Sequence, residues 1–172
     1  MPLNPRPNSF YKGASGWDIF DAPCWLFELM VPARPGWVVM MRILLVGQGP
    51  FGEKVLDTLI TRAEDVVGVY CPQDKRGEAM AARAADAGVA LFSPVKMKDA
   101  EVQEAYRELR PDLVILAFVT DIMPEALLDI PPLGTICYHP SLLPRHRGAS
   151  GINWAVIQGD RRTGLTILWV DK

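Results

Sequence analysis

The sequence predicts an α/β fold in which a parallel sheet carries helices on both faces. Two observations predict it. From Met41 onward, short apolar runs alternate with helical stretches of about ten residues, the order that right-handed crossover connections require. One of these runs, residues 113–118, is apolar throughout, as strands buried on both faces are. With 172 residues, 49% of them hydrophobic, the chain has room for one such domain.

The first half of this pattern starts with the apolar run 43–46, which is followed by a glycine-rich turn and a helix. A second strand is predicted at residues 66–70. The alanine-rich stretch 77–87 is predicted to be a helix that Gly88 closes, because glycine readily takes the left-handed conformation found after helices. A short third strand is predicted at residues 90–92.

The second half starts at Asp99, whose carboxylate is placed to cap a helix over residues 100–109, and the fourth strand, 113–118, follows. The remaining predicted elements are helix 124–128, strand 134–138, helix 151–158 and strand 165–170. Ligands of such sheets bind at the carboxyl ends of the strands. We therefore expect the loops 47–52, 119–123 and 139–148 to open onto one functional edge.

Residues 1–40 differ from the rest, since they contain six prolines and show no sustained period. Acidic residues, among them Asp18 and Glu28, argue against a mitochondrial presequence and a secretory signal. We interpret this segment as an extension outside the domain, either disordered or translated from an upstream region, with Met41 as the natural start. The domain is predicted to be 41–172.

The bulk composition limits the class of protein only in part. The net charge of -2 provides no general basic surface, so it neither supports nor excludes an RNA partner, whereas no apolar run is long enough for a membrane span. The cysteines, Cys24, Cys71 and Cys137, are odd in number and lack metal-ligand spacing. We therefore expect a cytoplasmic protein without a bound metal.

The segment from Gly47 to Gly52 matches the glycine pattern of dinucleotide sites between a strand and a helix. Such sites also need an acidic residue after the second strand, where this chain has Tyr70, Cys71 and Pro72. The favoured interpretation is a tight turn in which Gly52 permits close packing. The alternatives are an NAD site, which would make the protein an oxidoreductase, and contact with another ligand.

The loop that follows the fifth strand is the strongest candidate for chemistry. Both histidines of the chain, His139 and His146, fall within it beside Arg145 and Arg147. An imidazole can gain and lose a proton at neutral pH, which suits acyl or formyl transfer. A lone histidine is more often a packed or capping side chain, but the prolines on either side of residues 141–143 stiffen this loop as a preorganised site requires.

The sequence from Tyr138 to Ser150 resembles the signature loop of the formyltransferase family, and the similarity extends over most of 41–172. It is most similar to the hydrolase domain of 10-formyltetrahydrofolate dehydrogenases, and next to methionyl-tRNA formyltransferases. The resemblance implies a Rossmann-like sheet that binds 10-formyltetrahydrofolate as its substrate, with no NAD and no metal. It also implies formyl transfer or hydrolysis, with a folate, a tRNA acceptor or a further domain as partners.

The resemblance implies that His139 is the catalytic proton donor and that two segments line the folate pocket. The residues implied to line it are Phe118, Asp121, Ile122, Met123, Ser141, Leu142, Leu143 and Pro144. The apolar ones among them could instead serve packing alone. Arg145 and Arg147 would face an anionic partner, either the folate tail or RNA, or else solvent.

The sequence departs from the family at two places. Cys137 occupies the position at which most members have asparagine, and a thiol is a much weaker donor than an amide. Dehydrogenase hydrolase domains also lack the asparagine, which favours water or a carrier as acceptor. The family's essential aspartate, in a Leu-Asp-Thr-Gly-Asp segment, would follow Lys172. We therefore expect a fragment of low activity, with a non-catalytic folate-binding module as the alternative.

Overall fold

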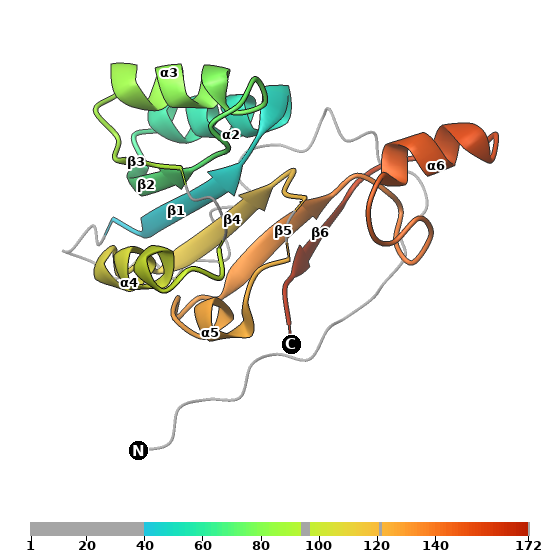
Figure 1. Ribbon diagram of the computed structural model, residues 1–172. Helices are drawn as coiled ribbons and strands as arrows, with labels where there is room; N and C mark the ends of the chain where they lie inside the picture. The colour runs from blue at the N-terminus through green and yellow to red at the C-terminus, as the bar shows by residue number, and fades with distance from the viewer. Residues whose placement is uncertain (1–39, 94–96, 121, 172) are drawn as a thin grey trace, which may run out of the picture. The chain divides into compact units, whose positions relative to one another are not determined.

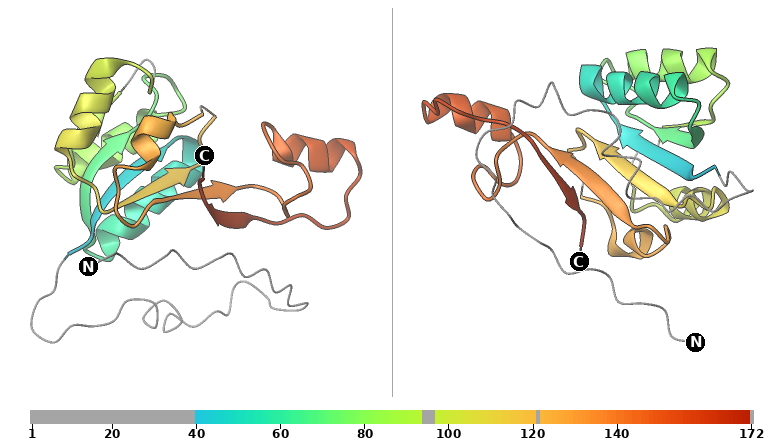
Figure 2. Two further views of the ribbon diagram at one scale, coloured as in Figure 1. Left: turned by 90° about the horizontal axis from the view of Figure 1, so that it is seen from below. Right: turned by 180° about the vertical axis from the view of Figure 1, so that it is seen from behind.

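The computed structural model describes residues 40–93, 97–120 and 122–171 (Figures 1 and 2). Their strands form one six-stranded sheet in the order β3-β2-β1-β4-β5-β6. The strands are β1 Arg42–Gly47, β2 Asp65–Tyr70, β3 Leu91–Phe92, β4 Leu113–Ala117, β5 Thr135–His139 and β6 Thr166–Trp169. The helices are α2 Gly49–Thr61, α3 Glu78–Asp86, α4 Ala100–Glu108, α5 Glu125–Leu128 and α6 Gly151–Ile157. The predicted elements and the α/β class are confirmed.

Two apolar cores lie on opposite faces of the sheet, because successive side chains of a strand point to opposite sides. In β1, Leu44 packs with Tyr106 of α4 and Leu127 of α5. Leu45, the next residue, packs with Leu56 of α2 and Met80 of α3. Figure 1 shows α2 and α3 on one side of the sheet and α4 and α5 on the other. Both faces of the central strands are therefore covered, as their continuous apolar sequences predict.

The carboxyl ends of the central strands meet at one edge of the sheet. β1 pairs in parallel with both β2 and β4, and β4 pairs in parallel with β5. The chain leaves the sheet at β3 on one side of β1 and re-enters at β4 on the other side, so the strand order reverses between β1 and β4. Such a reversal is where open α/β sheets bind ligands.

The sheet is not purely parallel, which corrects one part of the prediction. β6 is antiparallel to β5, with Cys137 opposite Leu168 and His139 opposite Thr166. A parallel strand needs a connection that crosses the face of the sheet. Here α6 stands beyond the carboxyl ends of the strands, as both views in Figure 2 show. The chain therefore returns from the edge at which β5 ended.

The structure confirms the end predicted for one helix and corrects the cap predicted for another. Gly88 follows α3 with a φ of 67°, the left-handed conformation predicted for it. Asp99 occupies the N-cap position of α4 with extended backbone, but its side chain makes no capping hydrogen bond. The predicted carboxylate cap is therefore wrong, although the helix begins where it was expected.

Candidate functional site

His139 is the last residue of β5 and is half-buried at the carboxyl edge of the sheet. Its Nε2 atom lies 3.0 Å from the backbone carbonyl oxygen of His146. A carbonyl oxygen can only accept a hydrogen bond, so Nε2 carries a proton and donates it. Among the described residues Nδ1 has no hydrogen-bond partner, and in the neutral ring it is the nitrogen with the lone pair. Nε2 is thus held by a hydrogen bond, and Nδ1 is the nitrogen that can exchange a proton with a substrate.

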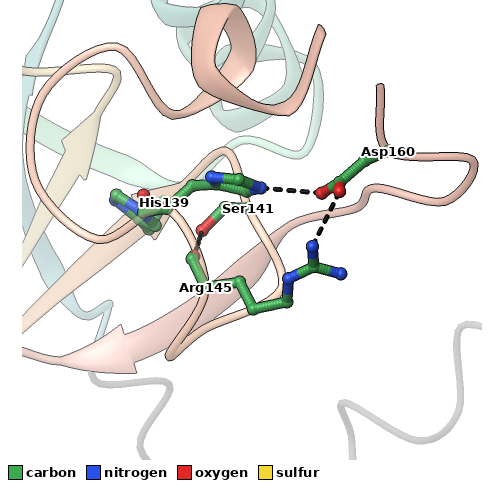
Figure 3. Close-up of polar contacts among 5 residues, drawn as sticks. His139, Ser141, Arg145 and Asp160 are labelled. Atoms are coloured by element: carbon green, nitrogen blue, oxygen red, sulfur yellow. Dashed lines mark hydrogen bonds and ion pairs between the residues drawn. The ribbon is translucent and has the colours of Figure 1, made fainter. Parts of the chain in front are cut away.

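Hydrogen bonds within the chain hold the loop after His139. The Ser141 hydroxyl donates to the Arg145 carbonyl oxygen at 2.7 Å, a contact drawn in Figure 3. The Thr166 hydroxyl of β6 donates to the Ser141 carbonyl oxygen at 2.8 Å and accepts from the Leu143 amide at 3.2 Å. The Leu143–Pro144 peptide bond is cis. The loop is therefore built as one unit, tied to the neighbouring strand.

Replacing Thr166 with valine should lower the free energy of unfolding by about 2 kcal/mol, because it leaves the half-buried Leu143 amide and Ser141 carbonyl without their partner. Thr166→Ser keeps the hydroxyl and should cost less than about 1 kcal/mol. Urea unfolding followed by circular dichroism measures both values. Equal losses in the two variants would show that the hydroxyl does not tie the loop to β6.

Asp160, after α6, binds the loop through both carboxylate oxygens. Its Oδ2 accepts a bond from His146 Nε2 at 2.7 Å, and its Oδ1 pairs with Arg145 Nη2 at 2.7 Å. Figure 3 shows the side chain of Arg145 reaching toward the carboxylate of Asp160. The hydrogen bond from His146, followed by the charge of Arg145, lowers the pKa of Asp160 below its ordinary value. The carboxylate is therefore ionised at neutral pH.

This shifted pKa predicts a specific dependence of stability on pH. The unfolded chain binds a proton at Asp160 more readily than the folded one, so the contribution of Asp160 is complete above its ordinary pKa of 3.8. It is lost as the pH falls through the lower folded value. The difference in unfolding free energy between the wild type and Asp160→Asn should therefore shrink as the pH is lowered from 6 to 3. A constant difference in urea titrations would contradict it.

The residues predicted to line the folate pocket fall into two groups. Ile122 and Leu142 are 87% and 48% exposed, and Phe118 is exposed with a φ of 62° directly after β4. Met123 is only 8% exposed and packs in the core with Leu127.

Within the second predicted segment, Leu143 is half-buried and Pro144 is exposed, whereas Ser141 is buried with its hydroxyl bonded inside the loop. Asp121 lies outside the described residues. The exposed members lie on loops that leave neighbouring parallel strands at the same edge.

Cys137 lies two residues before His139 and, by strand alternation, on the same face of the sheet. It is half-buried opposite Leu116 and Leu168, and its Sγ atom donates to the Tyr138 carbonyl oxygen at 3.5 Å. Burial raises the pKa of this thiol, which is therefore neutral at neutral pH. Cys137 thus offers a weak donor at most.

The glycine-rich turn shows the close packing predicted for it. A Cβ atom on Gly47 would lie 2.8 Å from the Ala117 carbonyl oxygen, and one on Gly52 would lie 3.2 Å from the Gly47 carbonyl carbon. The Gln48 amide donates to Ala117 and the Gly49 amide donates to Arg76, so both are bonded within the protein. These glycines let β1, β4 and α2 approach one another.

A cavity of about 460 Å³ lies at the carboxyl ends of β1, β2 and β4, beside this turn. Its walls include Gln48, Tyr70 and Thr120, and the residues 139–148 do not line it. The described part of the chain brings together no three His, Cys, Asp or Glu side chains that suit a metal ion. None of its helices has the length and apolar character that crossing a bilayer requires.

The sequence pointed to His139 as a candidate but assigned no role to Asp160. Arg145 was expected to meet an anionic partner or solvent, and it meets the carboxylate of Asp160. The sequence shows only that Asp160 is an acidic residue in the turn between the predicted helix 151–158 and the last strand, which does not indicate its partners. The spacing between Asp160 and His146 has no period that would have paired them.

The chain is similar in sequence to proteins of known families. A family model described as formyl transferase matches residues 41–172. The chain is 41% identical over 138 residues to the mitochondrial 10-formyltetrahydrofolate dehydrogenase of Mus musculus, covering 76% of this chain and 15% of that protein. It is 42% identical over 139 residues to the methionyl-tRNA formyltransferase of Geotalea daltonii, covering 76% of this chain and 45% of that one. It thus spans less than half the length of these relatives.

Solved structures share the architecture. The phosphoribosylglycinamide formyltransferase of Streptococcus pneumoniae TIGR4 matches with a TM-score of 0.63 and 27% identity, covering 77% of this chain and 74% of that one. A formyltetrahydrofolate deformylase of Pseudomonas syringae pv. tomato matches with a TM-score of 0.63 and 22% identity, covering 78% and 47%. The second likeness concerns the fold alone.

Proposed function

The chain belongs to the formyl transferase family, and on that premise we propose that it binds 10-formyltetrahydrofolate at the carboxyl ends of β4 and β5 and removes the formyl group with the help of His139. The observation that carries the proposal is the His139 ring, which has Nε2 fixed on the His146 carbonyl and Nδ1 without a partner among the described residues. A proton can therefore be exchanged at a single, oriented atom.

The chemistry needs that proton at one step. A nucleophile attacks the formyl carbon, and the carbon–oxygen double bond becomes a single bond to an oxyanion. Collapse of this intermediate restores the double bond and breaks the bond between the carbon and N10 of the folate. N10 leaves with a proton. Nδ1 of the neutral His139 ring takes a proton from the attacking group as it adds and donates a proton to N10 as the carbon–nitrogen bond breaks, so the ring ends as it began. The nucleophile keeps the formyl group.

Water is the acceptor we propose, with formate and tetrahydrofolate as products. Cys137 supports this choice, because its neutral and weakly donating thiol stands where most family members have an amide. The hydrolase domains of the dehydrogenases lack that amide as well. The similarity to a methionyl-tRNA formyltransferase makes methionyl-tRNA the second candidate acceptor. Incubation of the chain with 10-formyltetrahydrofolate, with and without methionyl-tRNA, separates the two by their product. A folate-binding module without catalysis would give neither formate nor formyl-methionyl-tRNA.

The folate would lie against the exposed apolar side chains of the two loops, with backbone groups of the loops bonding the pterin. Replacing Ile122 or Leu142 with serine should weaken binding of 10-formyltetrahydrofolate about tenfold, since each removes apolar surface worth roughly 1.4 kcal/mol. Titration calorimetry measures this affinity. Val156→Ser is the matched control, because Val156 is 76% exposed on α6, outside both loops. Equal affinities in all three variants would place the folate elsewhere.

A further inference from the structure

Asp160 is fixed more firmly than its place in a surface turn would suggest. Its backbone amide donates to the Ala155 carbonyl oxygen at 2.9 Å, which ties it to α6. Its side chain is 9% exposed and that of His146 is 6% exposed, although Arg145 and Arg147 on either side of His146 are exposed. Within the loop, it is therefore the His146 ring that turns inward to meet the carboxylate.

The same residue, His146, connects Asp160 to His139. Its ring donates to Asp160 Oδ2 at 2.7 Å, and its carbonyl oxygen accepts from His139 Nε2 at 3.0 Å. His146 has a φ of 50°, a left-handed conformation that non-glycine residues adopt only where the surroundings impose it. The direction of its carbonyl group therefore depends on whatever holds the residue in place.

We propose that Asp160 is a positioning residue for His139: by holding the His146 ring, it fixes the carbonyl oxygen that keeps the proton of the neutral His139 ring on Nε2. This inference rests on the proposed function, since it assigns Nδ1 of His139 to the folate side. Asp160 itself touches neither folate nor the formyl group. Without it, the carbonyl oxygen of His146 is free to move, and the His139 ring keeps only the weaker preference for Nε2–H that a free histidine ring has.

The other partner of Asp160 supplies a matched control. Arg145→Gln removes the ion pair at Oδ1 but leaves the His146 bond at Oδ2. If the carboxylate held the loop only through its ion pair, replacing Arg145 would change the tautomer of the His139 ring as much as replacing Asp160. If it acts through His146, Arg145→Gln should leave the His139 ring as it is.

The test is long-range ¹H–¹⁵N correlation of the histidine rings in the whole chain, without folate, for the wild type, Asp160→Ala and Arg145→Gln. Alanine is used because an asparagine oxygen could still accept the bond from His146. The Nε2–H tautomer of His139 should dominate in the wild type and in Arg145→Gln, and the Nδ1–H tautomer should become populated as well in Asp160→Ala. His146→Asn is a second variant for the case that Asp160→Ala does not fold. Asparagine tolerates the left-handed conformation but is too short to reach Asp160. It should also show both tautomers.

A folded Asp160→Ala or His146→Asn variant with the same tautomer populations at His139 as the wild type would overturn the proposal. Where formate release is measurable, Asp160→Ala should lower kcat roughly tenfold to a hundredfold, the cost of losing a supporting contact, with KM nearly unchanged. The tautomer readout requires no substrate. A wild-type chain that releases no formate would therefore count against the proposed function alone, and an unchanged tautomer against Asp160 alone.

Discussion

Replacing His139 with glutamine is expected to lower the single-turnover rate of formate release from 10-formyltetrahydrofolate by roughly 10²–10⁴-fold, the usual contribution of general acid–base catalysis. The glutamine amide can donate to the His146 carbonyl oxygen as Nε2–H does, so the loop keeps its contact. An amide neither ionises nor takes up a proton near neutral pH, so it cannot act as a general acid and the departing nitrogen loses its donor. The affinity for folate should change little.

The rate is measured with the chain in excess over substrate, by following formate and tetrahydrofolate together. Arg147→Gln serves as control, because Arg147 is an exposed residue of the same loop and its loss should leave the rate within about twofold. Circular dichroism verifies that each variant is folded. If His139→Gln released formate as fast as Arg147→Gln, proton transfer by His139 would be excluded.

Gly47→Val is expected to have the largest effect on stability, about 3 kcal/mol or more, because it forces side-chain atoms against fixed backbone. A Cβ atom there would lie 2.8 Å from the Ala117 carbonyl oxygen and 3.4 Å from Gly52 Cα. Neither neighbour can rotate away, so β1 would have to separate from β4 or from α2. Urea unfolding should show a lower midpoint with a similar slope.

The matched control for this substitution lies two residues further along the same turn. Gly49 has a φ of 64°, but nothing lies within 4 Å of the position of its Cβ. Gly49→Asn should therefore cost about 1 kcal/mol or less, since asparagine accepts the left-handed conformation. Equal losses at the two positions would mean that close packing is not what Gly47 provides.

Most of the fold could be predicted from the sequence because its signals are local. Apolar runs marked the strands, and the run 113–118 indicated by its continuity that both faces of β4 are covered. The direction of β6 could not be predicted in this way. It depends on where α6 lies relative to the sheet, and the apolar residues of α6 do not specify which neighbour, if any, they pack against.

The residues of the candidate site also divide into those that the sequence could indicate and those that it could not. His139 could be identified because it follows a predicted strand directly, and parallel strands expose their carboxyl ends at one edge. Ser141 lies in the predicted segment, but its hydroxyl bonds the Arg145 carbonyl oxygen, a partner that only the loop conformation determines. Asp160 became visible only in the structure, because its contacts with Arg145 and His146 depend on the chain turning back after α6.

The central claim, that this chain binds a formylated folate and removes its formyl group beside His139, is tested most directly by ¹³C NMR with 10-formyltetrahydrofolate labelled at the formyl carbon. With the chain in excess, the formyl resonance should shift or broaden on binding, and it should then convert to formate faster than in His139→Gln. A formyl resonance that neither changes on addition of the chain nor yields product would contradict the claim.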